Sequence, residues 1–362
     1  MKTVISVTTD RQPGGIATAL IGYSRALDMA GYRHMVILPD GASVLPALAK
    51  EPNIEVKTFP PGWLKFHLLT RFIFCASVRA SLSDARAILV HNARLLSSVS
   101  RLAPPHFLVN HSGKLRYLEK ADNILFLSSA AQNRAKRAFD ELGIAASDQP
   151  KTIILPHGFL IPAAARKKAA KQDKGKIPKI IAAGRFVEKK GFTDLIDAAA
   201  LLQHQNISCR IELYGAGPLE NSYRRQIDQL GVKNLALKGW AENLSSCFAK
   251  ADIFCLPSHE EPFGLILGEA MLAGLPVIAS MTDGPSDILG TGGTRLEATL
   301  PCGGLLYPQG APEALAEALC LLIKDRKKRA AAALAGTRHI SEHYSLAQQA
   351  QALDAILTAA KR

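Results

Sequence analysis

The sequence lacks the cysteine patterns of disulfide-rich and zinc-binding proteins. Its six cysteines are scattered, without a C-x-x-C pair and without a histidine at metal-ligand spacing. A disulfide framework and a structural zinc site are therefore disfavoured, and we expect buried thiols in a reducing compartment.

Signals for export and membrane insertion are also missing. No uncharged apolar run reaches the ~18 residues that a membrane-spanning helix requires. The opening stretch, Met1 to Thr8, is a strand pattern without the apolar core and cleavage site of a signal peptide. We therefore expect a cytoplasmic protein, either free or peripheral at the inner face of the cytoplasmic membrane.

Two further absences weigh against other function classes. The G-x-G-x-x-G fingerprint of dinucleotide-binding folds does not occur, which disfavours a two-domain Rossmann-like dehydrogenase. No RNA- or DNA-binding motif is present, so a basic nucleic-acid-binding protein is disfavoured too, and no nucleic-acid partner is expected. The chain has 362 residues, 48% of them hydrophobic, which favours two domains with a core each.

Positive charge is abundant but unevenly distributed. Of the net charge of +13, +7 falls in residues 1–150, +6 in residues 151–178 and none in residues 179–362. The excess serves either solubility or the binding of an anionic partner by the first domain. Residues 161–178 hold six cations and one acid and predict a basic, solvated linker.

Residues 60–82 combine aromatic and basic side chains. Trp63 stands near one end, three phenylalanines and several leucines are interleaved with cations, and no acid occurs between Val56 and Ser83. Such a segment can lie in the interface of an anionic membrane. The alternative is a core helix with a few exposed cations, because aromatic stripes usually pack inside.

Short apolar segments alternate with helical patterns in both halves, which predicts parallel sheets built from βαβ units. In the first half, Gly14 and Gly15 fall between a strand and a helix, where the backbone can approach a ligand. Several strands there end in histidine, and His111, followed by Ser112 and Gly113, is the best candidate for a site residue. Ligands bind at this edge of open α/β sheets.

The second half contains the densest candidate site, Ser258 to Ser280. Glu261 and Glu269 bracket a seven-residue segment that opens Pro-Phe-Gly and lies between two strand patterns. Pro262 predicts a helix start, where backbone N–H groups attract phosphate and the two carboxylates can take hydroxyls. The alternative is that both are ordinary solvated acids of a helix start.

Two cations lie in a glycine-flanked loop after an earlier strand of this half. Arg185 follows Gly184, and Lys190 precedes Gly191. Arginine offers a planar fork and lysine a point charge, a combination suited to a diphosphate.

Together these segments resemble the retaining glycosyltransferases of family 4, which have the GT-B fold, and in particular those that act on bacterial cell-surface glycans and lipopolysaccharide. The resemblance covers nearly the whole chain. Its strongest marks are the E-x7-E pattern of Glu261 and Glu269, the Gly-Arg-Phe…Lys-Gly segment at 184–191, and Gly215-Ala-Gly-Pro at 215–218. The loop 283–287 and Gly303-Gly304-Leu305-Leu306 support it.

The resemblance implies an α/β fold of two doubly wound Rossmann-like domains that face each other across a cleft. The first covers residues 1–160 together with about 345–362, a helix that returns to it, and binds the acceptor. Residues 161–178 are the linker, and residues 179–344 bind the nucleotide-sugar.

It also implies roles for single residues. Arg185 and Lys190 stabilise the donor diphosphate, Glu261 contacts the transferred sugar, and His111 lies near sugar and acceptor; these four are the expected catalytic residues. Glu269 holds the ribose and Trp240 lies near the base. The remaining donor-binding residues implied are Gly14, Gly15, Gly184, Gly215, Gly217, Phe263, Gly264, Leu265 and Ile266.

Family members transfer the sugar with retention and without a metal, so no metal or cofactor is expected. The donor is a UDP-, GDP- or ADP-sugar. The expected reaction moves a hexose-type sugar to a hydroxyl of a lipid-linked or lipopolysaccharide-core glycan; a soluble small molecule or polysaccharide is the alternative acceptor. Two positions depart from the family pattern. Asp287 stands where a glutamate is common, and His157-Gly158 stands where family members have Asn-Gly.

Overall fold

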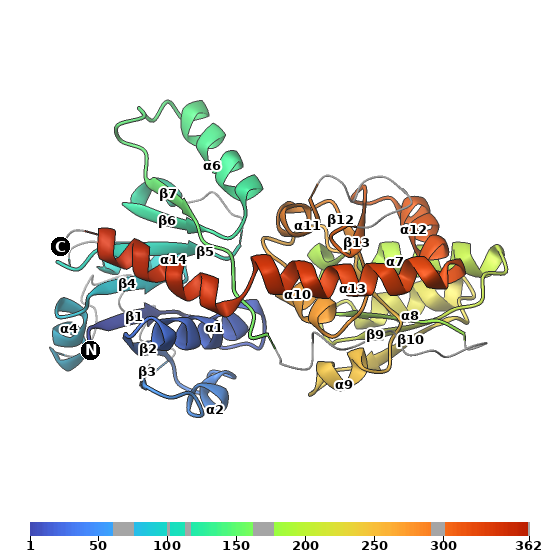
Figure 1. Ribbon diagram of the computed structural model, residues 1–362, viewed down its shortest axis with the longest axis horizontal. Coiled ribbons are helices and arrows are strands. Elements are labelled where there is room, and N and C mark those ends of the chain that lie inside the picture. The colour runs from blue at the N-terminus through green and yellow to red at the C-terminus, as the bar shows by residue number, and fades with distance from the viewer. Residues whose placement is uncertain (61–75, 100–101, 113–116, 162–176, 291–300, 361–362) are drawn as a thin grey trace. The chain divides into compact units, whose positions relative to one another are not determined.

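The computed structural model describes residues 1–60, 76–99, 102–112, 117–161, 177–290 and 301–360. The chain forms two compact units, one of Met1–Leu160 with Tyr344–Arg362 and one of Ile161–His343 (Figure 1). Each unit is an α/β domain with a single parallel sheet, so the predicted α/β class is confirmed.

The first unit has a seven-stranded sheet in the order β3-β2-β1-β4-β5-β6-β7. All its pairings are parallel. The central strands are almost fully buried and apolar, as expected for a parallel sheet covered on both faces. The strands are β1 Thr3–Val7, β2 Arg33–Pro39, β3 Ile54–Phe59, β4 Ala87–Val90, β5 His106–Asn110, β6 Asn123–Phe126 and β7 Lys151–Ile154.

The last helix of the chain packs on this first unit. Ser345 caps α14 through a capping box with Gln348. Phe159 bridges to Ser345, and Arg86 Nη2 donates to carbonyls at the end of α14, including that of Ala360 at 3.0 Å. The predicted return of the last helix is thereby confirmed. The helices of the unit are α1 Gly15–Met29, α2 Leu45–Leu48, α4 Ala76–Ser83, α5 Leu96–Val99, α6 Ser129–Glu141 and α14 Leu346–Ala359, with the 3₁₀ turns η1 Ala93–Leu95 and η2 Leu118–Lys120.

The second unit has a six-stranded parallel sheet in the order β10-β9-β8-β11-β12-β13. One core cluster unites residues of β8, β9 and β11 with the helices α7 and α12. The strands are β8 Lys179–Ala183, β9 Arg210–Tyr214, β10 Leu235–Gly239, β11 Ile253–Leu256, β12 Val277–Ser280 and β13 Gly304–Tyr307.

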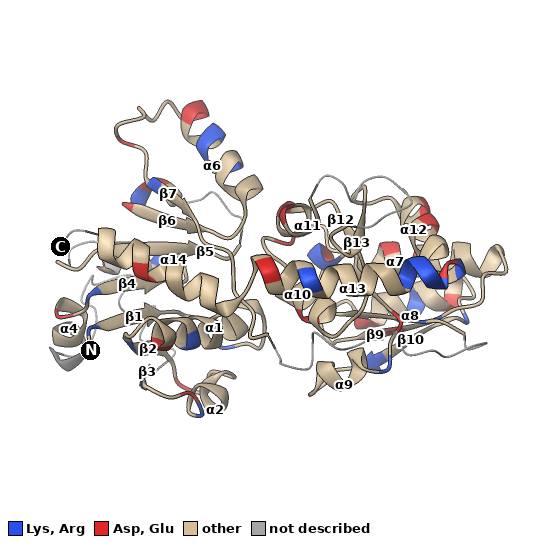
Figure 2. Cartoon of the chain, in the orientation of Figure 1, with Lys and Arg blue, Asp and Glu red and all other residues tan. Residues whose placement is uncertain are grey.

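The helices of this unit include one that the sequence reasoning missed, α13, which opens with Arg-Lys-Lys-Arg. Figure 2 shows this basic first turn, and elsewhere in the unit cations and acids are interspersed. The helices are α7 Phe192–His204, α8 Glu220–Gln229, α9 Leu244–Phe248, α10 Leu265–Leu272, α11 Asp283–Leu289, α12 Pro312–Lys324 and α13 Arg326–His343, with the 3₁₀ turn η4 Glu188–Lys190.

Two predictions concern segments that lie largely outside the described residues. Of the segment 60–82, residues 61–75 are outside, and only the part from Ala76 is described, as the start of α4. Of the linker 161–178, residues 162–176 are outside. Among the described residues, no helix combines the length and apolar character that crossing a bilayer requires.

Candidate functional site

The strand order of the second unit creates a switch point between β8 and β11. The chain runs outward from β8 to β9 and β10, then returns to the other side of β8 with β11. The connections that follow β8 and β11 therefore diverge to opposite sides of the sheet, which opens a place for a ligand at their carboxyl ends. The loop after β8 contains Arg185 and Lys190, and the loop after β11 contains Glu261.

Backbone hydrogen bonds hold these two loops together. The N–H groups of His259 and Glu260 both donate to the carbonyl of Lys189, at 2.8 and 3.2 Å. His259 Nε2 also lies 2.8 Å from Asp194 Oδ2, at the start of α7. The turn η4 is thus fixed against the segment that precedes α10.

The loops bring two predicted site residues into direct contact. Lys190 Nζ lies 2.6 Å from Glu261 Oε2, and the two side chains keep 19% and 12% of their surface exposed. Ser258 Oγ donates to the same carboxylate oxygen at 3.3 Å. Arg185 is exposed, and no salt bridge to it occurs among the described residues. Arg185 is thus accessible to an anionic ligand, beside the ordered contact between Lys190 and Glu261.

Cations crowd this loop enough to affect one another. The pKa of Lys189 is lowered by burial and by the positive charges of Lys190 and Arg185. A dianionic group placed here relieves that repulsion, which favours binding of a diphosphate.

Helix α10 begins later than the proline predicts. Pro262 and Phe263 lie in the turn before it, and Gly264 is the N-cap residue with φ 92°, a left-handed conformation that favours glycine. The prediction of a helix start at Pro262 is wrong, because the chain needs this left-handed residue to enter the helix. The first helical residues are therefore Leu265 and Ile266, whose N–H groups point out of the helix start.

Glu269 lies in the second turn of α10 in a poorly hydrated position. Burial raises the pKa of its carboxyl to about 7. Among the described residues, no side-chain hydrogen bond reaches it. A desolvated carboxylate without donors is stabilised by hydroxyl groups of a ligand, as its predicted role with a ribose requires.

The loop after β12 closes against the segment before α10. Gly284 donates its N–H to the carbonyl of Glu261 at 2.9 Å, and a Cβ at Gly284 would collide with the backbone of Phe263. Only glycine permits this approach. The residues from Asp283 form helix α11, whereas the sequence reasoning treated 283–287 as a loop.

The other predicted donor-binding residues of this unit follow β8, β9 and β10. Gly184 directly follows β8 and donates its N–H to the carbonyl of Tyr214 at 3.0 Å. Gly215 and Gly217 flank Ala216, whose carbonyl accepts from the N–H of Phe186 at 2.9 Å. Trp240 follows β10, the outermost strand, and is 52% exposed, so it lies away from the switch point.

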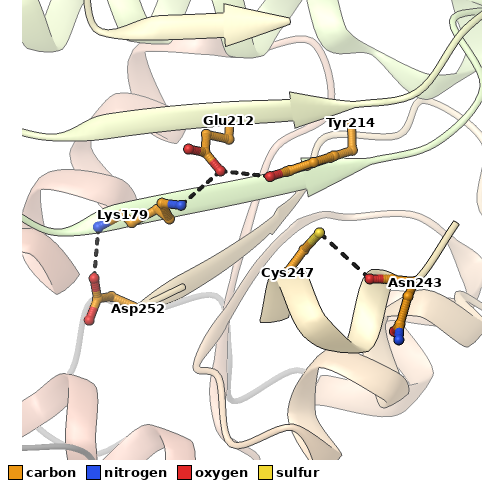
Figure 3. A network of polar contacts seen from close by, with 6 residues as sticks. All are labelled: Lys179, Glu212, Tyr214, Asn243, Cys247 and Asp252. Atoms are coloured by element: carbon orange, nitrogen blue, oxygen red, sulfur yellow. Dashed lines mark hydrogen bonds and ion pairs between the residues drawn. The ribbon is translucent and has the colours of Figure 1, made fainter. Parts of the chain in front are cut away.

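A polar network supports the β8–β9 side of the sheet (Figure 3). Lys179 Nζ and Tyr214 Oη both contact Glu212 Oε2, at 2.9 and 2.8 Å. Although burial acts to raise it, the pKa of Glu212 is held below its usual value by these hydrogen bonds. Tyr214 precedes Gly215 directly, so the network fixes the strand end from which the glycine loop departs.

In the first unit, the equivalent switch point lies between β1 and β4. Gly14 and Gly15 stand between β1 and α1, as predicted, with Gly15 as the first helical residue. His111 follows β5, and its Nε2 lies 2.7 Å from Nδ1 of His91, which follows β4.

Sequence reasoning did not single out His91, His34 or Ser6, which lie in contact around this switch point. The occurrence of histidine directly after strands was an available signal for His91, whereas His34 and Ser6 lie within β2 and β1 and carried no such signal. Their grouping depends on strand order, which the sequence does not reveal.

Within the described ranges, no three His, Cys, Asp or Glu side chains are placed to share a metal ion. In the same ranges, five cysteines are free thiols; Cys209 and Cys255 are buried, as predicted, but Cys247, Cys302 and Cys320 are only half-buried.

Residues 164–339 match the family described as "Glycosyl transferases group 1". The chain is 29% identical over 153 residues to the lipopolysaccharide core biosynthesis glycosyltransferase LpsE of Rhizobium meliloti, covering 42% of this chain and 41% of LpsE. It is 27% identical over 260 residues to a GDP-mannose-dependent monoacylated alpha-(1-6)-phosphatidylinositol monomannoside mannosyltransferase of Corynebacterium glutamicum, covering 67% and 64%. Both matches span less than two thirds of the relative.

Among solved structures, Anabaena HepE in complex with UDP and glucose superimposes with a TM-score of 0.77 at 20% identity, covering 99% of this chain and 100% of HepE. At this identity the likeness concerns the fold, and it confirms the GT-B fold class. The family match covers the loops with Arg185, Lys190 and Glu261. The second unit is therefore similar to the group 1 glycosyl transferases over nearly its whole length.

Proposed function

We infer that the chain is a retaining, metal-independent glycosyltransferase that moves a hexose-type sugar from a nucleotide-sugar to a glycan hydroxyl. The observation that carries this inference is the Lys190–Glu261 contact of 2.6 Å at the β8/β11 switch point, with exposed Arg185 in the same loop. A cation pair for a diphosphate and a carboxylate for sugar hydroxyls stand together there.

In this mechanism the second unit acts on the leaving group. Negative charge grows on the diphosphate as the glycosidic bond breaks, and Arg185 and Lys190 stabilise it. The acceptor hydroxyl arrives on the same face of the sugar, and the leaving phosphate takes its proton. No protein carboxylate pair at glycosidase spacing is then needed.

The two glutamates bind the hydroxyl groups of the donor. Glu261, already paired with Lys190, contacts the transferred sugar, and Glu269 accepts hydrogen bonds from the ribose. This role is supported by the burial of Glu269, which raises the pKa of its carboxyl to about 7, since hydroxyl donors from a ligand would stabilise the charged form.

The acceptor we propose is a lipid-linked or lipopolysaccharide-core glycan. Support comes from the relatives, whose names describe lipopolysaccharide core synthesis and mannosylation of a phosphatidylinositol glycolipid. The cation excess of residues 1–178 also favours an anionic surface as the acceptor's location.

A donor screen tests the proposal directly. UDP-, GDP- and ADP-sugars, with NAD as a comparison, are offered to the full chain. Thermal shift and slow hydrolysis are the readouts, and one nucleotide-sugar should stabilise the protein and be cleaved. Stabilisation by NAD instead would favour a dehydrogenase, and a response to none of these would refute a nucleotide-sugar transferase.

The acceptor is tested separately by co-sedimentation with phosphatidylglycerol vesicles at low and high salt. Binding at low salt that is lost at high salt supports a membrane-borne acceptor. Absence of binding at low salt, together with transfer to soluble glycans, would favour the soluble acceptor.

A further inference from the structure

The first unit contains a group of buried histidines that the proposed function uses only at one end. His34, His91 and His157 are 2–4% exposed, and His111 is half-buried beside them. Buried imidazoles need hydrogen-bond partners, and the order of those partners decides which nitrogen of each ring carries the proton.

Four consecutive contacts link helix α1 to His111. Starting from α1, the distances are 2.7 Å from Ser24 Oγ to His34 Nδ1 and 2.8 Å from His34 Nε2 to Ser6 Oγ. They continue with 3.1 Å from Ser6 Oγ to His91 Nε2 and 2.7 Å from His91 Nδ1 to His111 Nε2. Every link has the length of a hydrogen bond.

The last link is well aligned. The ring planes of His91 and His111 are 18° from parallel and their centroids are 5.0 Å apart. With the two nitrogens 2.7 Å apart, the remaining separation is taken up by the two ring radii, so the rings lie end to end. This geometry points an N–H of one ring at the nitrogen lone pair of the other.

The direction of the chain follows from its first member. Ser24 has a single hydroxyl hydrogen and donates it to the carbonyl of Leu20 at 2.9 Å. It must therefore accept from Nδ1–H of His34, which leaves Nε2 of that ring as an acceptor. The reverse direction would give up the hydrogen bond to Leu20.

The same logic passes along the remaining links. Ser6 donates to His34 and accepts from Nε2–H of His91. Nδ1 of His91 then accepts from Nε2–H of His111. The Nδ1 atom of His111 is left as a lone pair, and no hydrogen bond to it occurs among the described residues.

This order requires neutral rings, and burial keeps them neutral. Burial lowers the pKa of His34 and of His111 to about 3. The pKa of His91 is well below its usual value because of burial and the neighbouring His111, His34 and His157. At pH 7 the ring of His111 is therefore neutral, and its lone-pair nitrogen can accept a hydrogen bond from a hydroxyl without taking up the proton.

We propose that Ser24, His34, Ser6 and His91 are positioning residues that hold His111 in its Nε2–H tautomer, so that Nδ1 accepts a hydrogen bond from a hydroxyl of the transferred sugar. The substrate in this statement rests on the proposed function. The tautomer itself rests only on the contacts within the first unit.

The test is ¹⁵N-histidine NMR of the full chain at pH 7, which distinguishes protonated from unprotonated ring nitrogens. We expect His91 and His111 as Nε2–H tautomers and His34 as the Nδ1–H tautomer. In Ser24→Ala the acceptor for His34 is lost, so the chain should reverse and His111 should become the Nδ1–H tautomer. Ser24→Thr, which keeps a hydroxyl, should restore the wild-type spectrum.

Tyr23→Phe is the matched control. Its hydroxyl is buried on the same helix, has no hydrogen-bond partner within the described structure, and its ring contacts His91 and His157 edge-on. Removing it should leave all tautomers unchanged. If Ser24→Ala does not fold, Ser6→Ala interrupts the chain at the residue that contacts His91 directly.

Kinetics complete the test. With the nucleotide-sugar found in the donor screen, Ser24→Ala should lower kcat roughly tenfold, the effect of one lost hydrogen bond, while Tyr23→Phe keeps wild-type kcat. An unreversed tautomer in Ser24→Ala, or a reversed one with unchanged kcat, overturns the proposal. Failure of the wild type to use any nucleotide-sugar refutes the proposed function, and the NMR still decides the tautomer.

Discussion

The switch point of the second unit is lined by charged side chains, whereas that of the first unit is lined by neutral ones. Lys190 and Glu261 form an ion pair that still contacts solvent, with Arg185 exposed beside it. In the first unit, His34 and His91 are almost fully buried and uncharged. The same sheet geometry therefore carries two kinds of polar group: charged side chains in one unit and neutral, hydrogen-bonded imidazoles in the other.

The largest expected effect comes from removing the charges of the second unit. We expect Lys190→Ala and Glu261→Ala each to lower kcat at least about 100-fold, because in the proposed mechanism Lys190 stabilises the charge that develops on the diphosphate and Glu261 holds the transferred sugar. The double variant should lose much less than the product of the two, since the residues act as a pair.

The control is the exposed pair Glu220–Arg224 on α8, which also has a 2.7 Å contact. Ala substitutions there should leave kcat unchanged, since exposed pairs contribute little. Near-wild-type turnover of Lys190→Ala and Glu261→Ala would contradict the role proposed for these two residues.

The next effect concerns the group that titrates near neutral pH. An inflection near pH 7 in a binding profile is usually assigned to histidine. Here, however, burial raises the pKa of Glu269 to about 7 and lowers that of His111 to about 3. If the ribose binds the carboxylate form, nucleotide affinity should rise roughly tenfold from pH 6 to pH 8, following the ionised fraction.

Calorimetric titration with the nucleotide diphosphate identified in the donor screen measures this. The inflection should disappear in Glu269→Gln and persist in His111→Gln. The opposite result would place the titrating group in the first unit and contradict the view that the first unit's site is neutral and the second unit's site is charged.

Stability should depend on pH in opposite directions in the two units. The buried histidines bind fewer protons when folded, so the stability that they contribute is complete above the unfolded pKa of 6.5 and is lost as the pH falls. Glu269 has a raised folded pKa, so its contribution is complete below about 4.5 and is lost as the pH rises through 7.

Scanning calorimetry tests the pH-dependent contribution of Glu269 to the stability of the second unit. Glu269→Gln should raise Tm by about 2–4 °C at pH 8 and by almost nothing at pH 5, where the wild-type carboxyl is mostly protonated. Exposed Glu260, changed to Gln, serves as the control with no gain at either pH. An equal gain of Glu269→Gln at both pH values would show that its carboxyl is not desolvated.

The smallest expected effect is that of chelation. The proposed mechanism assigns the leaving diphosphate to Arg185 and Lys190, so transfer in EDTA should equal transfer without it. A strict requirement for added Mg²⁺ would show that the two cations do not suffice.

Much of the fold was predictable because its signals are local. The strands at Ala87–Val90 and Ile253–Leu256 are short apolar runs between turn residues, and their positions match the predicted ones. The start of α10 was predicted wrongly, since the conformation of Gly264 depends on the packing of its loop rather than on Pro262. Strand β3, with its weakly apolar sequence Ile54–Phe59, gave no clear pattern and was missed.

By itself, the sequence determined the α/β class, the two βαβ series and the residue types of the charged loops, because apolar periodicity, glycines and the E-x7-E spacing are properties of neighbouring residues. Only the tertiary structure decided which side chains meet. Lys190 and Glu261 are 71 residues apart, and Ser6 and His91 are 85 apart. They come into contact because the sheet order places β11 beside β8 and β4 beside β1, an arrangement set by the packing of whole strands and helices.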